Sequence, residues 1–353
     1  MTDQDSRSDR GNPVDPESGS GLQTPSLETQ MATLVAADTD LAPVEAAQLA
    51  GTPTVAQSEA RLVLRRFVRH KAAMTAIVVL ILLVLLAFSS IGFGPIPGWW
   101  KYGYEEVGDI VNGGKPTLSL WPFTLGDHPF GQDNIGRDYF ARTMRGMQQS
   151  IIIALLVGLV STVIGTVVGA VAGYFRGWTE AVLMRLTDVV ITIPLLAIAA
   201  VVGHAIKGGG VVMLGVFVGF VTWTGLARIV RGEFLSLREK EFVDAARTVG
   251  ASPWRIIFRH ILPNTVGVIT VSATLSISGA ILLEASLSFL SFGITEPDTS
   301  LGQLLGAYRQ AMETRPYLFW WPGLLIVLIS LTINFIGDGL RDAFDPRQNR
   351  AKA

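Results

Sequence analysis

Six long stretches of the chain contain no Asp, Glu, Lys or Arg. They span 72–100, 146–175, 189–206, 208–227, 260–283 and 316–337, and each has at least 18 residues. A helix rises about 1.5 Å per residue, so roughly 20 residues cross the roughly 30 Å hydrocarbon core of a bilayer. Because a helix satisfies its own backbone hydrogen bonds in lipid, the pattern predicts six membrane helices. One large soluble helical core is the alternative, and six runs of this length argue against it.

The predicted organisation is that of an all-α membrane protein with two terminal tails. A basic segment and the first helix occupy 61–92, a long loop occupies 93–147, and a core with five more helices occupies 148–341. The tails are 1–60 and 342–353. The five core helices are expected at about 151–173, 187–206, 209–229, 265–290 and 317–338.

Basic residues are distributed unevenly over the segments between these helices. With the N-terminus in the cytoplasm, the cytoplasmic segments from residue 61 onward hold 18 Lys and Arg, and the segments on the opposite side hold 8. Cytoplasmic loops of membrane proteins carry the excess of Lys and Arg. We therefore expect both termini in the cytoplasm and two long extracytoplasmic loops, at about 93–147 and 294–316.

The composition agrees with a membrane location and excludes several other classes of protein. Of the 353 residues, 49% are apolar and 16% are charged, against about 25% charged in a typical soluble domain. The mean hydropathy is +0.43. A net charge of −1 excludes a strongly basic nucleic-acid binder. The chain has no cysteine, and its four histidines lack metal-ligand spacing, so we expect no metal and no cofactor.

The N-terminal tail differs from the rest of the chain in its charge. Residues 1–60 contain ten acidic residues, two arginines, five prolines and no aromatic residue. Such a segment cannot bury enough apolar surface to offset its chain entropy, so we expect a disordered acidic tail. An inert solvated tail is the favoured interpretation, and a regulatory segment is the alternative.

Small residues lie on one face of two of the predicted helices. They are Gly165, Gly169 and Gly173 in the second helix, and Ser272, Ser276 and Gly279 in the fifth. Small residues let helix backbones approach closely in lipid. Close packing is the favoured interpretation of both stripes. For the fifth helix, the polar wall of a translocation pathway is the alternative.

Glu284 lies in an otherwise apolar stretch near the outer end of the fifth predicted helix. An ionisable group in such a place is a candidate for function by default. A structural hydrogen bond is the favoured role, and contact with a substrate is the alternative. The same two interpretations apply to His204, near the outer end of the third helix.

The segment 241–263, between the fourth and fifth predicted helices, has the most informative pattern. Its apolar face comprises Phe242, Ala245, Ala246 and Val249, flanked by Glu241, Asp244, Arg247 and Thr248. Gly250 suits a left-handed helix end, and Ser252 can cap a second helix. Pro263 then interrupts the pattern before the fifth membrane helix. The pattern predicts two helices joined by a sharp turn, either open to another protein or lying in the lipid interface.

A resemblance to a known family decides between these two interpretations. Asp244-Ala245-Ala246, Gly250 and Ile261-Leu262-Pro263 resemble, in that order, the EAA loop of ABC importer permeases, where Glu is usual in place of Asp244. In that family the loop forms a coupling helix that docks into a groove of an ATPase subunit. Further motifs resemble the second permease subunit of the oligopeptide/dipeptide group. They lie at 65–71, 131–138, 284–290, 334–342 and 345–347.

The sequence departs from the pattern of this group at two positions. Gln132 stands where Thr is usual, and Leu301 stands where Trp is usual before Gly302. The first departure lies in the 131–138 motif and the second in the outer loop before the sixth predicted helix.

The resemblance implies the type I ABC importer permease fold, with six transmembrane helices and a cytoplasmic coupling helix. It assigns an ATPase-coupling role to Glu241, Phe242, Asp244, Ala245, Ala246, Val249, Gly250 and Pro263. The implied partners are a second permease subunit in a heterodimer, two ABC ATPase subunits and an extracytoplasmic substrate-binding protein, with no nucleic acid. The implied substrate is a di- or oligopeptide. Nickel chelates, glutathione or another small solute are the alternative.

Two other classes of function agree less well with the sequence. An ATP-binding enzyme would need a phosphate-binding loop, and no Gly-x-x-x-x-Gly-Lys-Ser/Thr pattern occurs. We therefore expect a non-catalytic subunit. An ion-driven secondary transporter usually needs several intramembrane carboxylates, and Glu284 is the one clear candidate. ATPase activity that requires a separate nucleotide-binding chain would distinguish these classes.

Overall fold

The computed structural model of the protein describes residues 59–205 and 210–345. The expected acidic tail therefore lies almost entirely outside the described residues, and so does most of the expected C-terminal tail. The side chain of His204 is also outside them, so both interpretations of this residue stay predictions.

The described chain is helical apart from its outer loops and turns. The helices are α2 (Glu59–Arg69), α3 (Lys71–Ser90), α4 (Tyr139–Phe175), α5 (Gly177–Thr192), α6 (Leu195–Ala205), α7 (Gly210–Thr222), α8 (Thr224–Arg238), α9 (Glu241–Thr248), α10 (Pro253–Ile256), α11 (Leu262–Phe289), α12 (Leu301–Ala307) and α13 (Tyr317–Phe344). Short turns of other helix types are η1 (Asn112–Gly114), η2 (Ile257–Ile261) and η3 (Arg309–Met312). Two small antiparallel hairpins pair β1 (Gly92–Phe93) with β2 (Ile96–Pro97) and β3 (Ser119–Leu120) with β4 (Phe123–Thr124).

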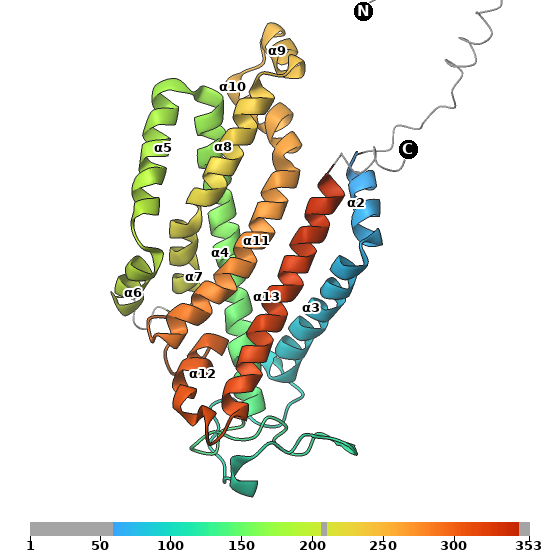
Figure 1. The fold of residues 1–353 in the computed structure, drawn as a ribbon, viewed down its shortest axis with the longest axis vertical. Helices are drawn as coiled ribbons and strands as arrows, with labels where there is room; N and C mark the ends of the chain where they lie inside the picture. The colour runs from blue at the N-terminus through green and yellow to red at the C-terminus, as the bar shows by residue number, and fades with distance from the viewer. Residues whose placement is uncertain (1–58, 206–209, 346–353) are drawn as a thin grey trace, which may run out of the picture. The chain divides into compact units, whose positions relative to one another are not determined.

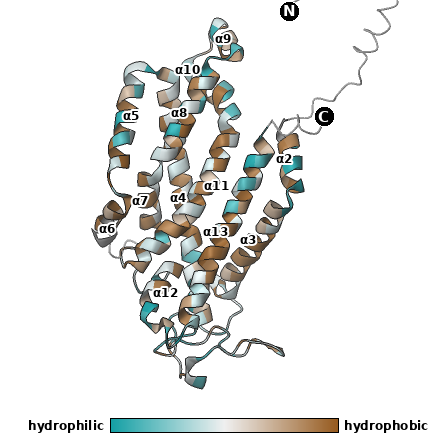
Figure 2. Ribbon diagram, in the orientation of Figure 1, coloured by the Kyte–Doolittle hydropathy of each residue, from teal (hydrophilic) through white to brown (hydrophobic). Residues whose placement is uncertain are grey.

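Four continuous helical stretches are long and apolar enough to cross a membrane. They are α3, α4, the stretch Pro253–Phe289 and α13. Two pairs of helices are long and apolar enough when each pair is taken together, but the helices of each pair are bent relative to each other. The bend is 77° between α5 and the first part of α6, and 44° between α7 and α8. Six spans result if each bent pair is one span, which is the number that the apolar runs predict. Figure 2 shows apolar residues along the length of these helices.

Each of the five core spans extends past its predicted bounds at one end or both, and charged residues lie inside these extensions. α8 ends at Arg238 rather than near 229, the span Pro253–Phe289 begins before 265, and α13 ends at Phe344 rather than near 338. α4 begins at Tyr139 rather than near 151, with Asp138 as its N-cap. It includes Arg142, whose guanidinium group lies 2.8 Å from the Asp133 carboxylate. The helix predicted at 187–206 begins at Gly177 and breaks before Pro194, since a residue that precedes proline avoids the helical conformation. The helices therefore continue through charged residues beyond the charge-free runs.

α4 forms the centre of the helical bundle. It packs against α7, α8 and α11, and α13 packs between α11 and α3 (Figure 1). α9, the turn after it and α10 together form a helical hairpin at 241–256, called the α9 hairpin here. It lies at one end of the bundle, and α12 with the outer loops lies at the other.

Close packing explains the glycine stripe of α4. A Cβ atom at Gly165, Gly169 or Gly173 would lie 2.8 Å from Trp223 O, 2.5 Å from Ala227 O and 2.6 Å from Phe234 Cβ, respectively. The close packing predicted for this stripe is confirmed.

The stripe on α11 has a different environment. Gly279 is exposed, and a Cβ atom there would meet no heavy atom of the described residues within 4 Å. The Oγ of Ser276 donates to the carbonyl of Ser272 on its own helix, at 2.9 Å. Gly279 therefore has no close helix contact within the described chain, and both interpretations of this stripe stay predictions.

Candidate functional site

The α9 hairpin is attached to the bundle through its inner face. Val243 is fully buried, and it belongs to an apolar cluster with residues of α4, α8, α10 and η2. That cluster comprises Ala170, Tyr174, Leu226, Val230, Phe234, Val243, Ile256, Ile257 and Ile261. Ala246 is half-buried and packs against the same cluster. The hairpin is thereby connected to two helices that cross the bundle.

The outer face of α9 is open. Phe242 is 40% exposed and Val249 is 89% exposed. Ala245, Glu241 and Asp244 are also exposed. The structure therefore divides the predicted apolar face, because Ala246 faces the cluster whereas Phe242, Ala245 and Val249 remain accessible.

The sequence pattern did not identify Val243 as the residue that packs α9 against the bundle. It lies three residues before Ala246, so helical spacing allows a face built on this pair as well as the predicted one. The cluster under α9 decides between the two faces, and its members come from distant parts of the sequence.

The turn that follows α9 requires glycine because of its backbone conformation, although there is room for a side chain. Gly250 has φ +82°, and nothing lies within 4 Å of a Cβ built there. A residue with a side chain resists this left-handed conformation. Ser252 then caps α10, since its Oγ accepts a hydrogen bond from the backbone N–H of Arg255 at 3.4 Å. The predicted turn and cap are both present.

Pro263 does not separate two helices as the sequence suggested. It lies in the first turn of α11, directly after the π-helical turn η2, and 253–289 forms one continuous span. A proline removes one backbone donor and crowds the preceding turn. The wider π-helical turn before it lets the helical path continue.

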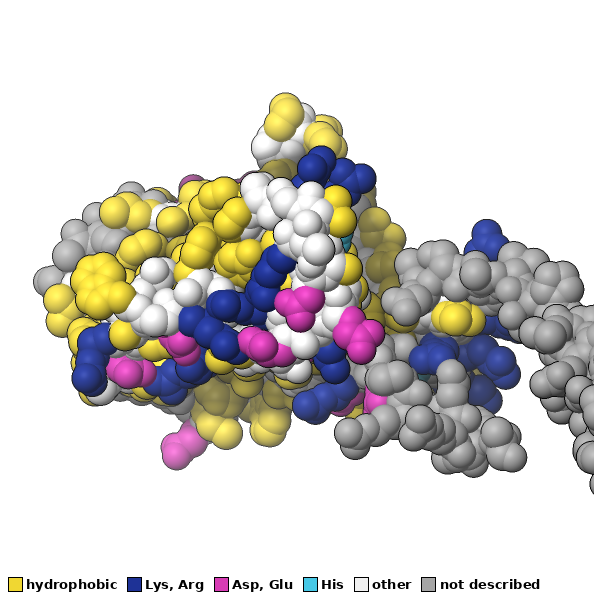
Figure 3. Space-filling model, turned by 90° about the horizontal axis from the view of Figure 1, so that it is seen from above, with side chains coloured by type: hydrophobic (Ala, Val, Ile, Leu, Met, Phe, Trp, Pro, Cys, Tyr) yellow, Lys and Arg dark blue, Asp and Glu magenta, His cyan; other side chains and the backbone are white. Residues whose placement is uncertain are grey.

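The end of the bundle that carries α9 is rich in charged side chains. Figure 3 shows Lys and Arg over this end, interspersed with Asp and Glu. Arg228 pairs with Asp188 at 2.6 Å, and Arg231 pairs with Glu180. Both pairs connect α8 to α5. On α9, the guanidinium group of Arg247 lies 3.0 Å from the Asp244 carboxylate.

Glu284 lies in the interior of the bundle. It is 2% exposed, and its carboxylate accepts hydrogen bonds from Ser150 Oγ at 2.9 Å and from Ser288 Oγ at 2.7 Å. Ser150 Oγ also accepts from the backbone N–H of Leu301 at 3.3 Å. These bonds connect α11, α4 and α12, a geometry that favours the structural role for Glu284. Ser272 and Ser276 are half-buried on the same helix and do not join this network.

A second buried network lies in the outer loops and is centred on Asp133. This residue is fully buried. Its carboxylate accepts from the backbone N–H of Arg137 at 2.9 Å, the side chain of Arg137 at 2.6 Å, Arg142 at 2.8 Å and the Tyr308 hydroxyl at 3.1 Å. Burial acts to raise the pKa of Asp133, but the hydrogen bonds from Arg137 and Ile135 outweigh it, and the pKa is lowered.

The same network connects the loop before α4 to the loop after α11. Arg142 pairs with Glu296 at 3.1 Å. Burial raises the pKa of Tyr308 to about 12, so this hydroxyl stays protonated and can donate to Asp133. The sequence motif at 131–138 contains Asp133, but it carries no signal for Tyr308 and Glu296, which are distant in sequence. Within 59–205 and 210–345, no group of three His, Asp or Glu side chains could hold a metal ion.

Comparison with known families agrees with this architecture. The model of the binding-protein-dependent transport system inner membrane component matches residues 165–350. The chain belongs to this family. A second model, the N-terminal TM domain of oligopeptide transport permease C, matches residues 58–109 of the permease.

Individual relatives cover most of the permease. The oligopeptide transport system permease protein OppC of Mycobacterium tuberculosis is 38% identical, over 82% of this chain and 95% of its own length. The OppC protein of Haemophilus influenzae is 36% identical, over 80% of this chain and 87% of its own. Among solved structures, the inward-facing MetNI methionine ABC transporter has a TM-score of 0.46 at 20% identity, covering 57% of this permease and 95% of that chain.

Family membership confirms the main sequence-based identification. The protein is a multi-pass membrane permease of an ABC importer, with the all-α fold predicted for the type I class. Permeases of such importers act in general with a second permease, ATPase subunits and a binding protein. The residues that couple to the ATPases and those that line the pathway stay predictions.

Proposed function

We propose that this permease imports di- or oligopeptides as one half of a heterodimeric pathway. The observation that carries the proposal is similarity over four fifths of the chain to relatives named oligopeptide transport permeases. Two separate ABC ATPases hydrolyse ATP, an extracytoplasmic binding protein delivers the peptide, and this subunit is non-catalytic. Import of nickel chelates, glutathione or another small solute by the same machinery is the alternative.

The proposed orientation places the α9 end in the cytoplasm. The excess of Lys and Arg in the segments at this end supports it. Both termini are then cytoplasmic, and the Asp133 network lies outside the membrane. Labelling of a tag before residue 61 from outside intact cells would contradict this orientation.

The α9 hairpin is the proposed coupling element. Its exposed residues Phe242, Ala245 and Val249 contact the ATPase, and Val243 transmits the movement to α4 and α8 through the buried cluster. ATP closes the ATPase pair, and the pathway between the two permeases changes from inward-open to outward-open. The peptide then enters from the binding protein, and hydrolysis restores the inward-open state.

Two variants of α9 separate contact with the ATPase from attachment to the bundle. Phe242→Ala removes an exposed side chain, so we expect loss of ATPase co-purification from a permease that is stably folded. Ala246→Trp enlarges the inner face, so we expect displacement of α9 and loss of both stability and coupling. Asp244→Glu keeps the charge and should have nearly no effect. Trp178→Ala, at an 82% exposed aromatic residue at the start of α5, is the control.

Transport in the assembled importer tests the substrate. Membrane vesicles with the permease and its partners are supplied with a labelled tripeptide, a labelled pentapeptide, a nickel chelate or glutathione. We expect ATP-dependent uptake of the peptides and loss of uptake in Phe242→Ala. Uptake of the nickel chelate or glutathione without peptide uptake would contradict the proposed substrate.

A further inference from the structure

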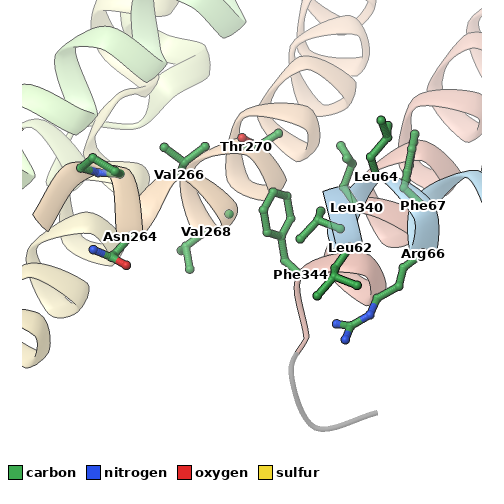
Figure 4. A pocket seen from close by; sticks show the side chains of 13 residues that line it. Leu62, Leu64, Arg66, Phe67, Asn264, Val266, Val268, Thr270, Leu340 and Phe344 are labelled. Atoms are coloured by element: carbon green, nitrogen blue, oxygen red, sulfur yellow. The ribbon is translucent and has the colours of Figure 1, made fainter. Parts of the chain in front are cut away.

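A groove lies between α11 on one side and α2 with the end of α13 on the other, at the α9 end of the bundle (Figure 4). Its volume is about 910 Å³. The walls are mainly apolar, with Leu62 and Phe67 from α2, Val266 and Val268 from α11, and Leu340 and Phe344 from α13. Figure 4 shows Phe344 and Leu62 between the facing ribbons. The groove is therefore suited to an extended apolar chain.

The apolar walls remain accessible in the described chain. Leu62 is 37% exposed and Val266 is 47% exposed, while Phe67 and Phe344 are half-buried. Apolar surface of this kind is stabilised when another apolar group covers it.

One side of the groove is strongly basic. α2 carries Arg61, Arg65, Arg66 and Arg69, and Lys71 begins α3. Arg66 lines the groove, and its one hydrogen bond to a described residue is a 3.5 Å contact to the backbone carbonyl of Asp345. Among the side chains that the structure describes from Arg61 onward, no carboxylate lies within 4.0 Å of the guanidinium group of Arg61, Arg65, Arg66 or Arg69. The cationic surface of α2 can therefore take an external anion.

Contacts at the corner between α2 and α3 hold this side of the groove against α13. His70 accepts a hydrogen bond from the Ala73 N–H and lies 3.3 Å from the Asp342 carboxylate on α13. A Cβ at Gly339 would lie 2.4 Å from the Cβ of Ala73. This close contact holds α3 against α13, and α2 leads directly into α3 through His70. The proposed membrane placement of α3 puts the basic side of the groove at the level of lipid headgroups.

We propose that the groove between α2, α11 and α13 binds an anionic phospholipid. An acyl chain lies along Val266, Val268 and Phe344, and the headgroup phosphate accepts hydrogen bonds from Arg66, with the other α2 arginines adding charge. Guanidinium groups form strong hydrogen bonds to phosphate, and basic pockets between membrane helices favour anionic lipids. The proposal rests on the proposed orientation and is independent of the transported substrate.

The first test compares two lipids with the same acyl chains. The full-length permease is purified in detergent and titrated with dioleoyl phosphatidylglycerol or dioleoyl phosphatidylcholine, and bound lipid is counted by native mass spectrometry. We expect one phosphatidylglycerol to be retained in preference to phosphatidylcholine. Equal retention of the two lipids would overturn the proposal.

Substitution of Arg66 tests the headgroup position. A basic residue near an anionic lipid surface contributes about 1 kcal/mol, so Arg66→Gln should weaken phosphatidylglycerol binding about fivefold. Arg66→Lys keeps the charge and should retain most of the binding. Arg255→Gln, at an exposed arginine of α10 outside the groove, is the matched control. An equal loss in Arg66→Gln and Arg255→Gln would show nonspecific attraction and overturn the site.

Filling the groove tests the acyl chain. Val266→Trp should reduce the binding of both lipids, whereas Leu324→Trp, on an exposed position of α13 outside the groove, should not. The titration is repeated on the importer assembled with its second permease. Retained phosphatidylglycerol supports the proposal, and its exclusion by the second permease would overturn it.

Peptide uptake distinguishes this proposal from the proposed function. Uptake with no preference for phosphatidylglycerol would contradict the lipid site alone. Specific lipid binding by a permease complex that imports no peptide would contradict the peptide substrate alone.

Discussion

Two regions of the permease contain similar small and charged residues, but these residues are covered in one region and exposed in the other. The closed region consists of the Asp133 network and the α4 seam, which we define as Gly165, Gly169 and Gly173. The open region consists of the exposed face of α9 and the α11 stripe, which we define as Ser272, Ser276 and Gly279. In the closed region, backbones and charges are covered by other parts of the same chain. In the open region, Gly279 and Val249 are exposed, and no other part of the described chain packs over them.

The difference shows that small residues at helical spacing do not by themselves define a helix contact. The α4 seam lies against α8, so the absence of a side chain brings two backbones together. On the α11 stripe, Gly279 meets open space within the described chain, whereas Ser272 and Ser276 are half-buried. Matched substitutions in the two regions test this comparison. The expected loss of stability is largest for the buried charge, smaller for the α4 seam and smallest for the serines of α11.

Asp133→Asn should have the largest effect. It removes a buried charge that pairs with Arg137 and Arg142, and an uncompensated buried charge typically costs about 3–5 kcal/mol. Asp244→Asn, in the exposed pair with Arg247, should cost about 0–1 kcal/mol. Thermal unfolding of the purified permease measures both. Similar losses from the two substitutions would remove the distinction between closed and open charges.

The same network predicts an acid transition. The folded pKa of Asp133 lies below its usual value of 3.8, so its contribution to stability is complete above that value and is lost as the pH falls through the folded pKa. Between pH 5 and pH 8 we expect no change from this group. Unfolding temperatures of the wild type and of Asp133→Asn, measured from pH 6 to pH 3, should converge only at the acid end.

Gly169→Leu tests the α4 seam directly. Even the Cβ would lie 2.5 Å from the carbonyl oxygen of Ala227, and overpacking typically costs about 1–3 kcal/mol. Gly279→Leu meets open space and should leave the folded yield in the membrane unchanged. If the α11 stripe lines the pathway, Gly279→Leu should nevertheless reduce peptide uptake. Equal folded yields for the two leucine variants would contradict the comparison.

Alanine in place of Gly169 and in place of Gly279 should have different effects on the stability of the permease. Gly169→Ala should destabilise because of the close approach of α8. Gly279→Ala should be neutral or stabilising by up to about 1 kcal/mol, because alanine has the higher helix propensity and its methyl group has space. The difference between the two melting temperatures is the quantity to measure. A shift in the same direction for both would show that tight packing is not specific to α4.

Two serines of α11 provide the smallest contrast. Ser278 is buried, and its Oγ lies 2.9 Å from the Oγ of Ser330 on α13, so Ser278→Ala should cost about 1 kcal/mol. Among the residues that the structure describes, the Oγ of Ser276 bonds only to the carbonyl of Ser272 on its own helix, so Ser276→Ala should change stability by a few tenths of a kcal/mol at most. A larger effect for Ser276→Ala would show that the stripe is packed after all.

The sequence determined the elements that depend on local chemistry. Six apolar runs predicted the number of spans, because a backbone in lipid must satisfy its hydrogen bonds within its own segment. The cap at Ser252 and the left-handed turn at Gly250 were predicted for the same reason, since their partners lie within a few residues. The order of motifs in 241–263 also identified the family, because those motifs follow one another along a single short segment.

Only the tertiary structure decided which faces are covered. Glu284 and Ser150 are 134 residues apart in the sequence, and Tyr308 lies 175 residues from Asp133, so neither hydrogen bond has a local signal. Val243 and Ala246 could lie on the same helical face as readily as Phe242 and Ala246, and the cluster beneath α9 selected the first pair. The same holds for the small residues: a glycine stripe permits a close contact, but the position of the neighbouring helix determines whether that contact forms.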